Sequence, residues 1–587
     1  MNNACASYTV TDRDVYTGLT HNTHKMRLQR GQILQNIQGE LIEAHTNRRI
    51  FLRGANVPAK LYPFKHHLTP PALKSLRSDF GFTAIRLVVT WEALEPREQQ
   101  YDTNYMAYIL ETVKTCADNG LAVIIDPHQD CWSTWTGGDG APGWTLERLG
   151  FVLDNLKRCC ATHPQQRGQH PLLWSTNYQL FAPATMFTLF FGSKRFAKNV
   201  RIDNLDAQEW LQGRFIEAFA QLAMVLKAER NVIGFGTLNE PSLGWIGHRD
   251  LRHMGTTRRF GYGLSPMQCI RLAAGESLYG VVHYGYPYIP TGIHTLNKEC
   301  ARLMAYGHQD IWPHDIKPDH FALDDQDEDA ETLFLHPFWK RFGDRIREAG
   351  GNDLLIFTEV PPLSDGNGTK PRPPPNRPPY EIRTPHFYDS VIMGLHRYVP
   401  WFALDNSTGW PAIGTDAAAK ARHNSVAALR RQGGVALGEV GACWLGESTD
   451  AAFDATFRAV ESNLMSAAFV WCYMPNHATD DEWNGENFSI WSQNQPRVKA
   501  AIRPYALRVA GRPLRMEYDG RRFMLQFQSL ECDIETTFET ILFKTDRGCV
   551  IDVSDGEYDS VERNIIRYRH TPTIKGSMHT VEMRFQT

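Results

Sequence analysis

The sequence of 587 residues has no basic block, no long apolar run and no regular cysteine spacing. Its 62 Lys and Arg residues are balanced by 65 Asp and Glu residues, so nucleic acid binding is not expected. No window approaches the ~18 apolar residues that a membrane-spanning helix requires. The polar N-terminal stretch also lacks the apolar segment of a secretory signal. We therefore expect an intracellular protein, in the cytoplasm or the vacuole.

The cysteine pattern argues against two further classes of protein. The 11 cysteines are an odd number, they are scattered, and Cys159 adjoins Cys160. Neither a disulfide framework nor a set of zinc ligands has this pattern. His128 and Asp130 alone are too few for a metal-dependent hydrolase. We expect no metal, no other cofactor and no obligate protein partner.

The length of the chain predicts a large domain and a smaller one, because it exceeds what one hydrophobic core usually supports. We expect a polar N-terminal extension at residues 1–31, a catalytic domain at 32–503 and a β-domain at 504–587. The last range consists of short alternating runs separated by turn residues such as Asp519-Gly520. This pattern of short alternating runs and turns is typical of a small antiparallel β-sandwich.

Eight apolar segments are predicted to be strands. Amphipathic helical stretches separate most of them. They are IFLRGAN, FTAIRLVV, LAVIID, VIGFGTL, DLLIFTE, TPHFYD, GVALGE and AAFVWCY. This alternation predicts an α/β fold of parallel strands, a (β/α)8 TIM barrel. The catalytic domain is longer than such a barrel usually is. The additional residues form insertions at 131–206, 242–335 and 360–384. These insertions follow the carboxyl ends of strands, where loops build the binding site of such a barrel.

The fourth segment, NVIGFGTLNEP, places Glu240 at the carboxyl end of a buried strand. A carboxylate there points toward the mouth of a parallel barrel. Two facing carboxylates can cleave a glycosidic bond, since one protonates the leaving oxygen while the other attacks the sugar carbon. Glu359 in LLIFTEVPP and Glu439 in GGVALGEVGACW both follow apolar runs. Periodicity alone leaves both open as the partner of Glu240.

Two of these strings resemble a known family. VIGFGTLNEP is similar to the fourth strand of family 5 glycoside hydrolases, and GEVG is similar to their seventh strand. The resemblance implies that Glu240 is the general acid/base, that Glu439 is the nucleophile and that Glu359 has a supporting role. It also implies a retaining mechanism, in which the two carboxyl groups lie about 5 to 5.5 Å apart.

Other residues at the ends of the predicted strands also match functional positions of the family, in the same order along the chain. By the resemblance, Arg86 and Tyr388 hydrogen-bond the nucleophile, and Asn239 binds the sugar 2-hydroxyl. Trp471 is expected to stack under the sugar. The remaining implied substrate contacts are His128, His386, Lys60, Asp130, Trp483, Asn484 and Glu486.

Three aromatic strings narrow the resemblance to one branch of the family. They are DPHQDCWSTWTGGDGAPGWTLE, TNYQLFAPATMFTLFFGSKRFA and WNGENFSIWS. They are similar to segments of endoglycoceramidases and of related fungal β-glucosidases. The resemblance implies a β-glucosidase that acts on a steryl glucoside or on glucosylceramide. Its expected partner is therefore a glycolipid, with peripheral contact to the membrane that holds it as a further hypothesis.

The apolar run Phe181–Phe196 has two possible structural interpretations. It is either a core helix or, together with the insertion at 242–335, a trough for the lipid part of the substrate. Two other enzymatic functions remain open, an endo-β-glycanase acting on polysaccharide and an endoglycoceramidase releasing an oligosaccharide. A non-catalytic binding barrel would lack one of the two glutamates, and both are present.

Overall fold

The computed structural model describes most of the chain. The described residues are 8–9, 28–36, 39–163, 171–254, 261–285, 289–313, 315–324, 329–362, 378–476, 487–529, 539–545, 548–571 and 576–586. Within these residues no helix is both long enough and apolar enough to cross a membrane.

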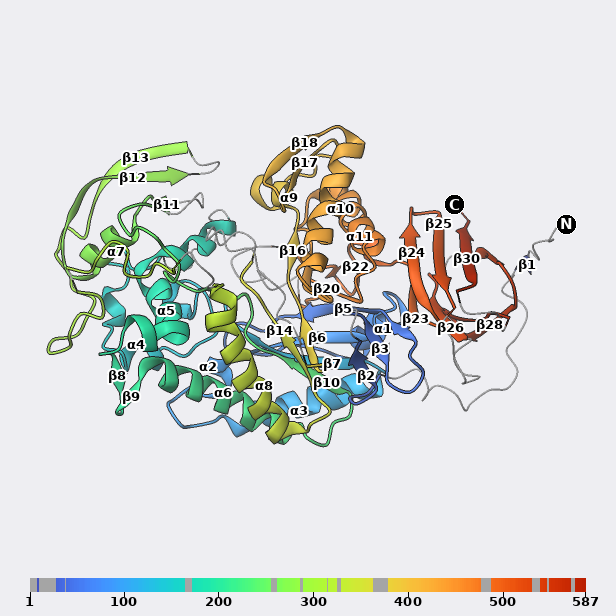
Figure 1. Ribbon diagram of the computed structural model, residues 1–587, viewed down its shortest axis with the longest axis horizontal. Coiled ribbons are helices and arrows are strands. Elements are labelled where there is room, and N and C mark those ends of the chain that lie inside the picture. Colours follow the sequence, from blue (N-terminus) through green and yellow to red (C-terminus); the bar gives the residue numbers. More distant parts are fainter. Residues whose placement is uncertain are drawn as a thin grey trace.

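A curled sheet of parallel strands forms the centre of the molecule (Figure 1). In spatial order its strands are β15 (Glu381–Arg383), β14 (Leu355–Thr358), β10 (Val232–Gly236), β7 (Ala122–His128), β6 (Ala84–Thr90), β5 (Leu52–Val57), β20 (Ala467–Val470), β19 (Ala436–Gly441) and β16 (Phe387–Tyr388). Each of the eight predicted strand segments contributes to it. These strands are buried along almost their whole length, as parallel strands covered on both faces must be.

The two edges of this sheet belong to one extended segment, so the barrel closes. β15 pairs with β14, and β16 pairs with β19, with only residues 384–386 between them. The intervening backbone joins both sides, because Val435 N–H donates to the Arg383 carbonyl at 3.0 Å and Gly438 N–H donates to the Pro385 carbonyl at 3.1 Å. The predicted (β/α)8 barrel is therefore confirmed, with its sixth strand in two parts.

Helices surround this barrel. They are α1 (Pro70–Ser78), α2 (Trp91–Leu94), α3 (Thr103–Asp118), α6 (Ala207–Val225), α8 (His336–Gly350), α10 (Thr415–Arg431) and α11 (Thr449–Ser462). The side chains of Thr69, Asp102 and Asp206 accept backbone N–H groups at the first turns of α1, α3 and α6. Such caps satisfy amide groups that have no partner within the helix, and they fix where each helix begins.

Insertions follow the carboxyl ends of β7, β10 and β16 and lie at the left and top of Figure 1. Two hairpins stand out, one formed by β12 and β13 and one formed by β17 and β18. The inserted elements are α4 (Trp144–Glu147), α5 (Phe181–Phe196), β8 (Arg201–Ile202), β9 (Leu205–Asp206), β11 (Gly261–Tyr262), α7 (Pro266–Ala273), β12 (Leu278–Gly285), β13 (Ile289–Leu296), α9 (Ser390–Leu395), β17 (Phe402–Asp405) and β18 (Trp410–Ile413).

Helix α5 is a core element, so the interpretation of Phe181–Phe196 as a lipid trough is wrong. Its side chains are buried except for two basic residues near the end of the helix. The Phe190 ring lies 5.8 Å from that of Phe215 on α6 and 5.1 Å from that of Phe338 on α8. The apolar character of this run therefore serves the interface between the insertion and the barrel helices.

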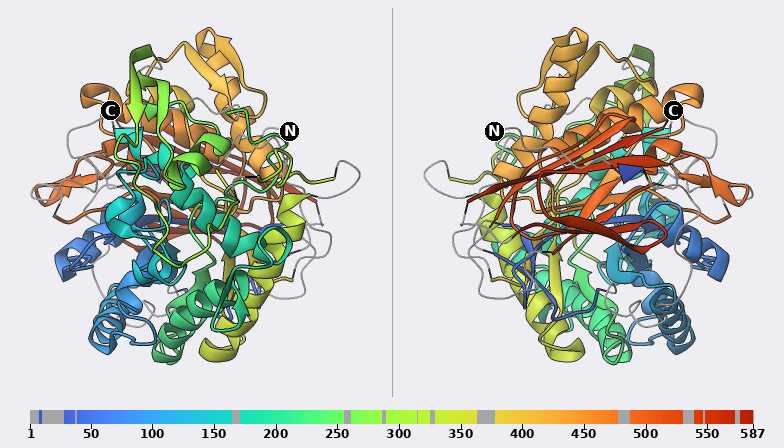
Figure 2. Two further views of the ribbon diagram at one scale, coloured as in Figure 1. Left: turned by 90° about the vertical axis from the view of Figure 1, so that its left-hand side faces the viewer. Right: turned by 90° about the vertical axis from the view of Figure 1, so that its right-hand side faces the viewer.

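The C-terminal residues form the predicted antiparallel β-sandwich, at the right of Figure 1 and facing the viewer in the right-hand view of Figure 2. One sheet has the order β1 (Tyr8–Thr9), β27 (Cys549–Val553), β30 (Met578–Phe585), β25 (Arg522–Gln528) and β24 (Arg512–Tyr518). The other has the order β2 (Ile33–Gln35), β3 (Leu41–Glu43), β4 (Arg49–Ile50), β23 (Tyr505–Val509), β26 (Glu539–Phe543), β29 (Ile565–Arg569) and β28 (Glu557–Glu562).

The sandwich is joined to the barrel by strands and by buried polar contacts. The first strands of the catalytic range, β2 to β4, pair with one another, and β4 pairs with β23 of the sandwich. The Tyr505 hydroxyl donates to the Gly81 carbonyl at 2.7 Å, and Arg503 pairs with Glu461 of α11 at 2.9 Å. The residue limits given above for the domains stay a prediction. The N-terminal extension lies mostly outside the described residues, as does the proline-rich stretch at 370–379.

Candidate active site

The two glutamates singled out from the sequence lie together at the carboxyl ends of the barrel strands. Glu240 follows β10, and Glu439 lies within β19. One oxygen of each carboxylate and one nitrogen of His386 lie within 4.8 Å of one another. The Glu240 side chain is 15% exposed and the Glu439 side chain 7%, so both are shielded from bulk water but reachable. This proximity suits a pair that acts on the two sides of one bond.

Glu439 is held by two donors. Arg86 Nη1 lies 3.0 Å from its Oε1, and the Tyr388 hydroxyl donates to its Oε2 at 2.8 Å. Both contacts were expected from the family resemblance. These two hydrogen bonds orient the carboxylate group that would act as the nucleophile.

Glu240 lies in a different electrostatic environment. Burial raises the pKa of its carboxyl group, and the negative charges of Glu439 and Asp130 raise it further, against the opposing effect of His386. His386 Nδ1 lies 2.8 Å from Glu240 Oε1. A carboxyl group with a raised pKa next to one that accepts hydrogen bonds from an arginine and a tyrosine is the arrangement that a general acid and a nucleophile need.

The backbone around Glu240 is fixed by its neighbours. Gln129 Nε2 donates to the Asn239 carbonyl at 2.7 Å and to the Glu240 carbonyl at 3.1 Å. The Asn239 amide group donates to the Gln129 carbonyl at 3.1 Å, while its oxygen accepts from Arg86 at 3.0 Å. Two strand ends, those of β7 and β10, are thereby tied to each other next to the reacting groups.

A second group of predicted residues forms one wall of the site. The His128 ring stacks on that of Trp471, with ring centres 5.4 Å apart and planes 9° apart. Lys60 Nζ lies 4.4 Å from the centre of the Trp471 ring and 2.5 Å from Asp130 Oδ2. Burial opposes ionisation of Asp130, yet the Lys60 charge lowers its pKa below the usual range. An indole face beside charged hydrogen-bonding groups is suited to a sugar ring and its hydroxyl groups.

His128, Asp130 and Asp139 bring ligand-type atoms within 4.8 Å of one another, a spacing that also suits a metal ion. The Lys60 ammonium group lies 2.5 Å from Asp130 and 3.9 Å from Asp139. This positive charge compensates Asp130, while burial and the Asp130 charge raise the pKa of Asp139 well above its usual range, and Lys60 is itself buried with them. The geometry therefore provides a cation from the chain itself.

Three residues of the site were missed from the sequence. Asp126 pairs with Arg86 and His128, each at 2.7 Å, Gln129 holds the Glu240 backbone, and Asp139 lies beside Lys60. Asp126 and Gln129 flank His128 in the string DPHQD, so their position next to a predicted strand end was a usable signal. Asp139 lies nine residues beyond Asp130 in a glycine-rich loop and had no such signal. Trp483, Asn484 and Glu486 lie outside the described residues.

Comparison with known proteins agrees with this geometry. The family model described as Cellulase (glycosyl hydrolase family 5) matches residues 51–256. The model described as Glycoside hydrolase family 5 C-terminal domain matches residues 503–583. The two matches fall on the barrel and on the sandwich, in that order along the chain.

Similar proteins extend the match over most of the chain. It is 26% identical to a glucosylceramidase of Rhizopus delemar, with 85% of this chain and 88% of the relative covered. It is 27% identical to an ergosteryl-beta-glucosidase of Saccharomyces cerevisiae, with 74% and 68% covered. The structure of Cryptococcus neoformans sterylglucosidase 1 has a TM-score of 0.84 at 22% identity, covering 94% of this chain and 97% of that one. The last comparison shows that the fold is shared.

Proposed function

This chain belongs to glycoside hydrolase family 5, and we propose that it is a retaining β-glucosidase that acts on a glucosylated lipid. The observation that carries the chemistry is the pair of carboxylates, Glu240 and Glu439, with oxygens within 4.8 Å of each other. Their different environments support Glu240 as the general acid/base and Glu439 as the nucleophile, since Glu240 has a raised pKa and Glu439 is held by Arg86 and Tyr388.

The proposed reaction has two steps. First, Glu439 attacks the anomeric carbon while the proton of Glu240 passes to the leaving alcohol, which breaks the glycosidic bond and forms a glucosyl ester on Glu439. Glu240, now a carboxylate, then takes a proton from a water molecule whose oxygen attacks the same carbon. This step releases glucose with its original anomeric configuration, frees Glu439 and restores the proton on Glu240.

The lipid part of the proposal rests on the relatives, one named a glucosylceramidase and one an ergosteryl-beta-glucosidase. An endo-β-glycanase or an endoglycoceramidase would use the same pair of carboxylates. Purified protein should release glucose from ergosteryl glucoside or from glucosylceramide, and Glu439→Gln should not. Release of an intact oligosaccharide from an oligohexosylceramide, or faster cleavage of a polysaccharide, would overturn the proposed substrate class.

Contact with the substrate's membrane is a further part of the proposal. The exposed apolar side chains of the two hairpins support it, among them Trp410 and Ile413 of β18, at 74% and 71% exposed, and Ile293 of β13, at 75%. Aromatic and aliphatic side chains on projecting loops can enter a lipid interface. Replacing Trp410 and Ile413 by serine should weaken sedimentation with vesicles that carry steryl glucoside, while hydrolysis of a soluble aryl glucoside stays unchanged. Equal vesicle binding by this variant would remove β18 from the proposal.

A further inference from the structure

A third carboxylate, Glu359, lies behind the two reacting ones, and we propose that it is a positioning residue that holds the catalytic proton of Glu240 through His386. The inference rests on the function proposed for the same site. It gives Glu359 a task in proton transfer, in place of a general supporting role.

Glu359 follows β14 and is connected to both members of the catalytic pair. It is 1% exposed, so it lies beneath the reacting groups and does not face the substrate. Its Oε1 pairs with Arg86, the same guanidinium group that binds Glu439. Its Oε2 lies 3.0 Å from His386 Nε2 and accepts the Glu240 backbone N–H at 3.3 Å. One buried carboxylate thus reaches the nucleophile through Arg86 and the acid/base residue through His386.

His386 is the link in this arrangement. Its Nδ1 lies 2.8 Å from Glu240, and its Nε2 lies on the other side of the ring against Glu359. The contact between His386 Nε2 and Glu359 is an ion pair. Within the described residues its geometry is not that of an aligned hydrogen bond. Burial alone would lower the pKa of His386, but Glu439 and Glu359 raise it well above the usual range. The ring is therefore held as an imidazolium between two carboxyl groups.

Glu359 also supports an unusual backbone conformation at Glu240. The φ angle of Glu240 is +37°, in the left-handed region that residues with a side chain rarely adopt. The N–H bond to Glu359 and the Gln129 bond to the Glu240 carbonyl hold the peptide groups on both sides of that residue. Such strain persists only where the surrounding contacts determine the conformation.

The charges around the Glu240–His386 pair predict the direction of a pH effect. Besides Glu359, the titratable groups that act on this pair include Glu439 of β19 and Asp130, Cys131 and Tyr178 of the insertion after β7. Arg86 of β6 lies against Glu359 and Glu439. Removing the negative charge of Glu359 weakens proton binding by the coupled pair. The proton needed by the leaving group should then be lost at lower pH.

The test compares Glu359→Gln with Glu331→Gln. Glu331 is a matched control, because it is also buried and pairs with an arginine, Arg383, and a histidine, His336. In Glu359→Gln the alkaline limb of the kcat/KM profile should move down by about one pH unit or more, as expected for loss of a close charge. The loss in kcat should be larger for aryl β-glucosides with poor leaving groups than for a dinitrophenyl β-glucoside. Glu331→Gln should show neither change.

A purely structural role predicts a different result. If Glu359→Gln lowers kcat/KM equally for all leaving groups and leaves the alkaline limb in place, the proposal is wrong. Glu359→Asp keeps the charge and should restore part of the wild-type profile, whereas an Asp variant no better than Gln would also contradict it.

A second measurement separates this inference from the proposed function. Nitrogen NMR of histidine-labelled protein, with the His386 signal assigned by its absence in His386→Gln, reports the charge of the ring without substrate. The imidazolium signal should persist well above the usual titration range of histidine in the wild type and titrate at lower pH in Glu359→Gln. If no β-glucoside is hydrolysed but this shift is seen, the proposed function fails and the Glu359–His386 coupling stands. An unshifted titration overturns the coupling whatever the activity.

Discussion

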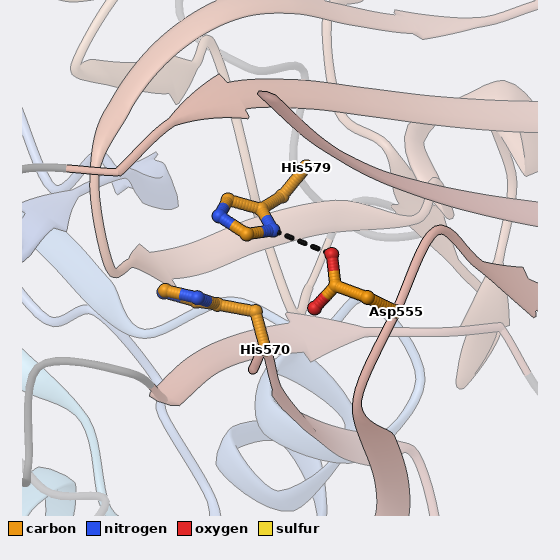
Figure 3. Close-up of side chains that lie close together, drawn as sticks. All are labelled: Asp555, His570 and His579. Carbon is orange, nitrogen blue, oxygen red and sulfur yellow. Dashed lines mark hydrogen bonds and ion pairs between the residues drawn. The ribbon is translucent and has the colours of Figure 1, made fainter. Parts of the chain in front are cut away.

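Two buried histidine–carboxylate clusters, one in the barrel and one in the sandwich, show what distinguishes a reactive site from a structural contact. In the barrel, His386 lies against Glu240, Glu359 and Glu439. In the sandwich, His579 Nδ1 lies 2.8 Å from Asp555, and the His570 ring lies against the His579 ring, tilted by 35°, with centres 4.0 Å apart (Figure 3). Each cluster brings three ligand-type atoms within 4.8 Å.

The difference between the clusters is the density of negative charge around each ring. Several carboxylates raise the pKa of His386, whereas burial and the neighbouring His579 charge lower the pKa of His570. In the barrel cluster Arg86 joins Glu439 to Glu359 and Asp126, and Glu240 has a raised pKa. A close histidine–carboxylate pair is therefore not by itself a sign of catalysis, since opposed environments of neighbouring carboxyl groups carry that information.

The largest effect should come from removing the acid/base residue of the barrel cluster. Glu240→Gln cannot protonate a leaving group, so cleavage of a lipid glucoside should fall by about 10²- to 10⁴-fold. A dinitrophenyl glucoside needs little protonation and should lose much less in the first step. The measurement is kcat/KM for both substrates, with Asp555→Asn as the control in the sandwich. A uniform loss for both substrates would remove the contrast between the two clusters.

A smaller effect is expected from the hydroxyl group that contacts the nucleophile. Tyr388→Phe removes one charge-assisted hydrogen bond from Glu439 and should lower kcat/KM by about 10- to 100-fold, equivalent to about 1.5–3 kcal/mol. Its aromatic packing against Phe488 is retained, so the melting temperature should change little. An unchanged kcat/KM would mean that this contact does not stabilise the reacting carboxylate.

The two regions should respond to pH in opposite directions. Despite burial, Asp126 raises the pKa of His128 in the barrel to about 9, so its stabilisation is complete below pH 6.5 and is lost as the pH rises through 9. That loss amounts to about 3 kcal/mol if 1.36 kcal/mol corresponds to one pH unit. His570 is held neutral, so its contribution is present above pH 6.5 and is lost on acidification. Denaturant unfolding across this range should show that His128→Gln reduces the alkaline decline, to which His386 also contributes, and that His570→Gln reduces the acid one.

The smallest effect on activity should come from the sandwich. His579→Gln breaks a buried hydrogen bond to Asp555 and should cost about 1–3 kcal/mol of unfolding free energy. Hydrolysis of a soluble aryl glucoside should stay within about twofold of the wild type while the protein remains folded. A large drop in kcat at a temperature where the variant is folded would show that the sandwich cluster acts on the site.

The strand ends were predictable from the sequence because burial on both faces and a polar stop leave a local signal. This holds for Glu240 and for the order of the barrel strands along the chain, whereas the choice of Glu439 over Glu359 needed the resemblance to the family. The position of α5 was not predictable, since a core helix and a lipid-binding surface can have the same apolar sequence. Asp139 lies beside Lys60, and Glu359 lies against both Arg86 and His386, because folding brings separate segments of the chain together. No local pattern in the sequence encodes these contacts. Pairing of β4 with β23 likewise joins residues more than 450 positions apart.

The central claim, that Glu439 is the nucleophile of a retaining β-glucosidase, is tested most directly by trapping the covalent intermediate. Incubation with a 2-deoxy-2-fluoro-β-glucoside bearing a good leaving group should label the protein, because the fluorine slows hydrolysis of the ester. Peptide mass spectrometry should place the label on Glu439. A label on Glu359, or rapid hydrolysis of ordinary β-glucosides to α-glucose without any label, would contradict the account.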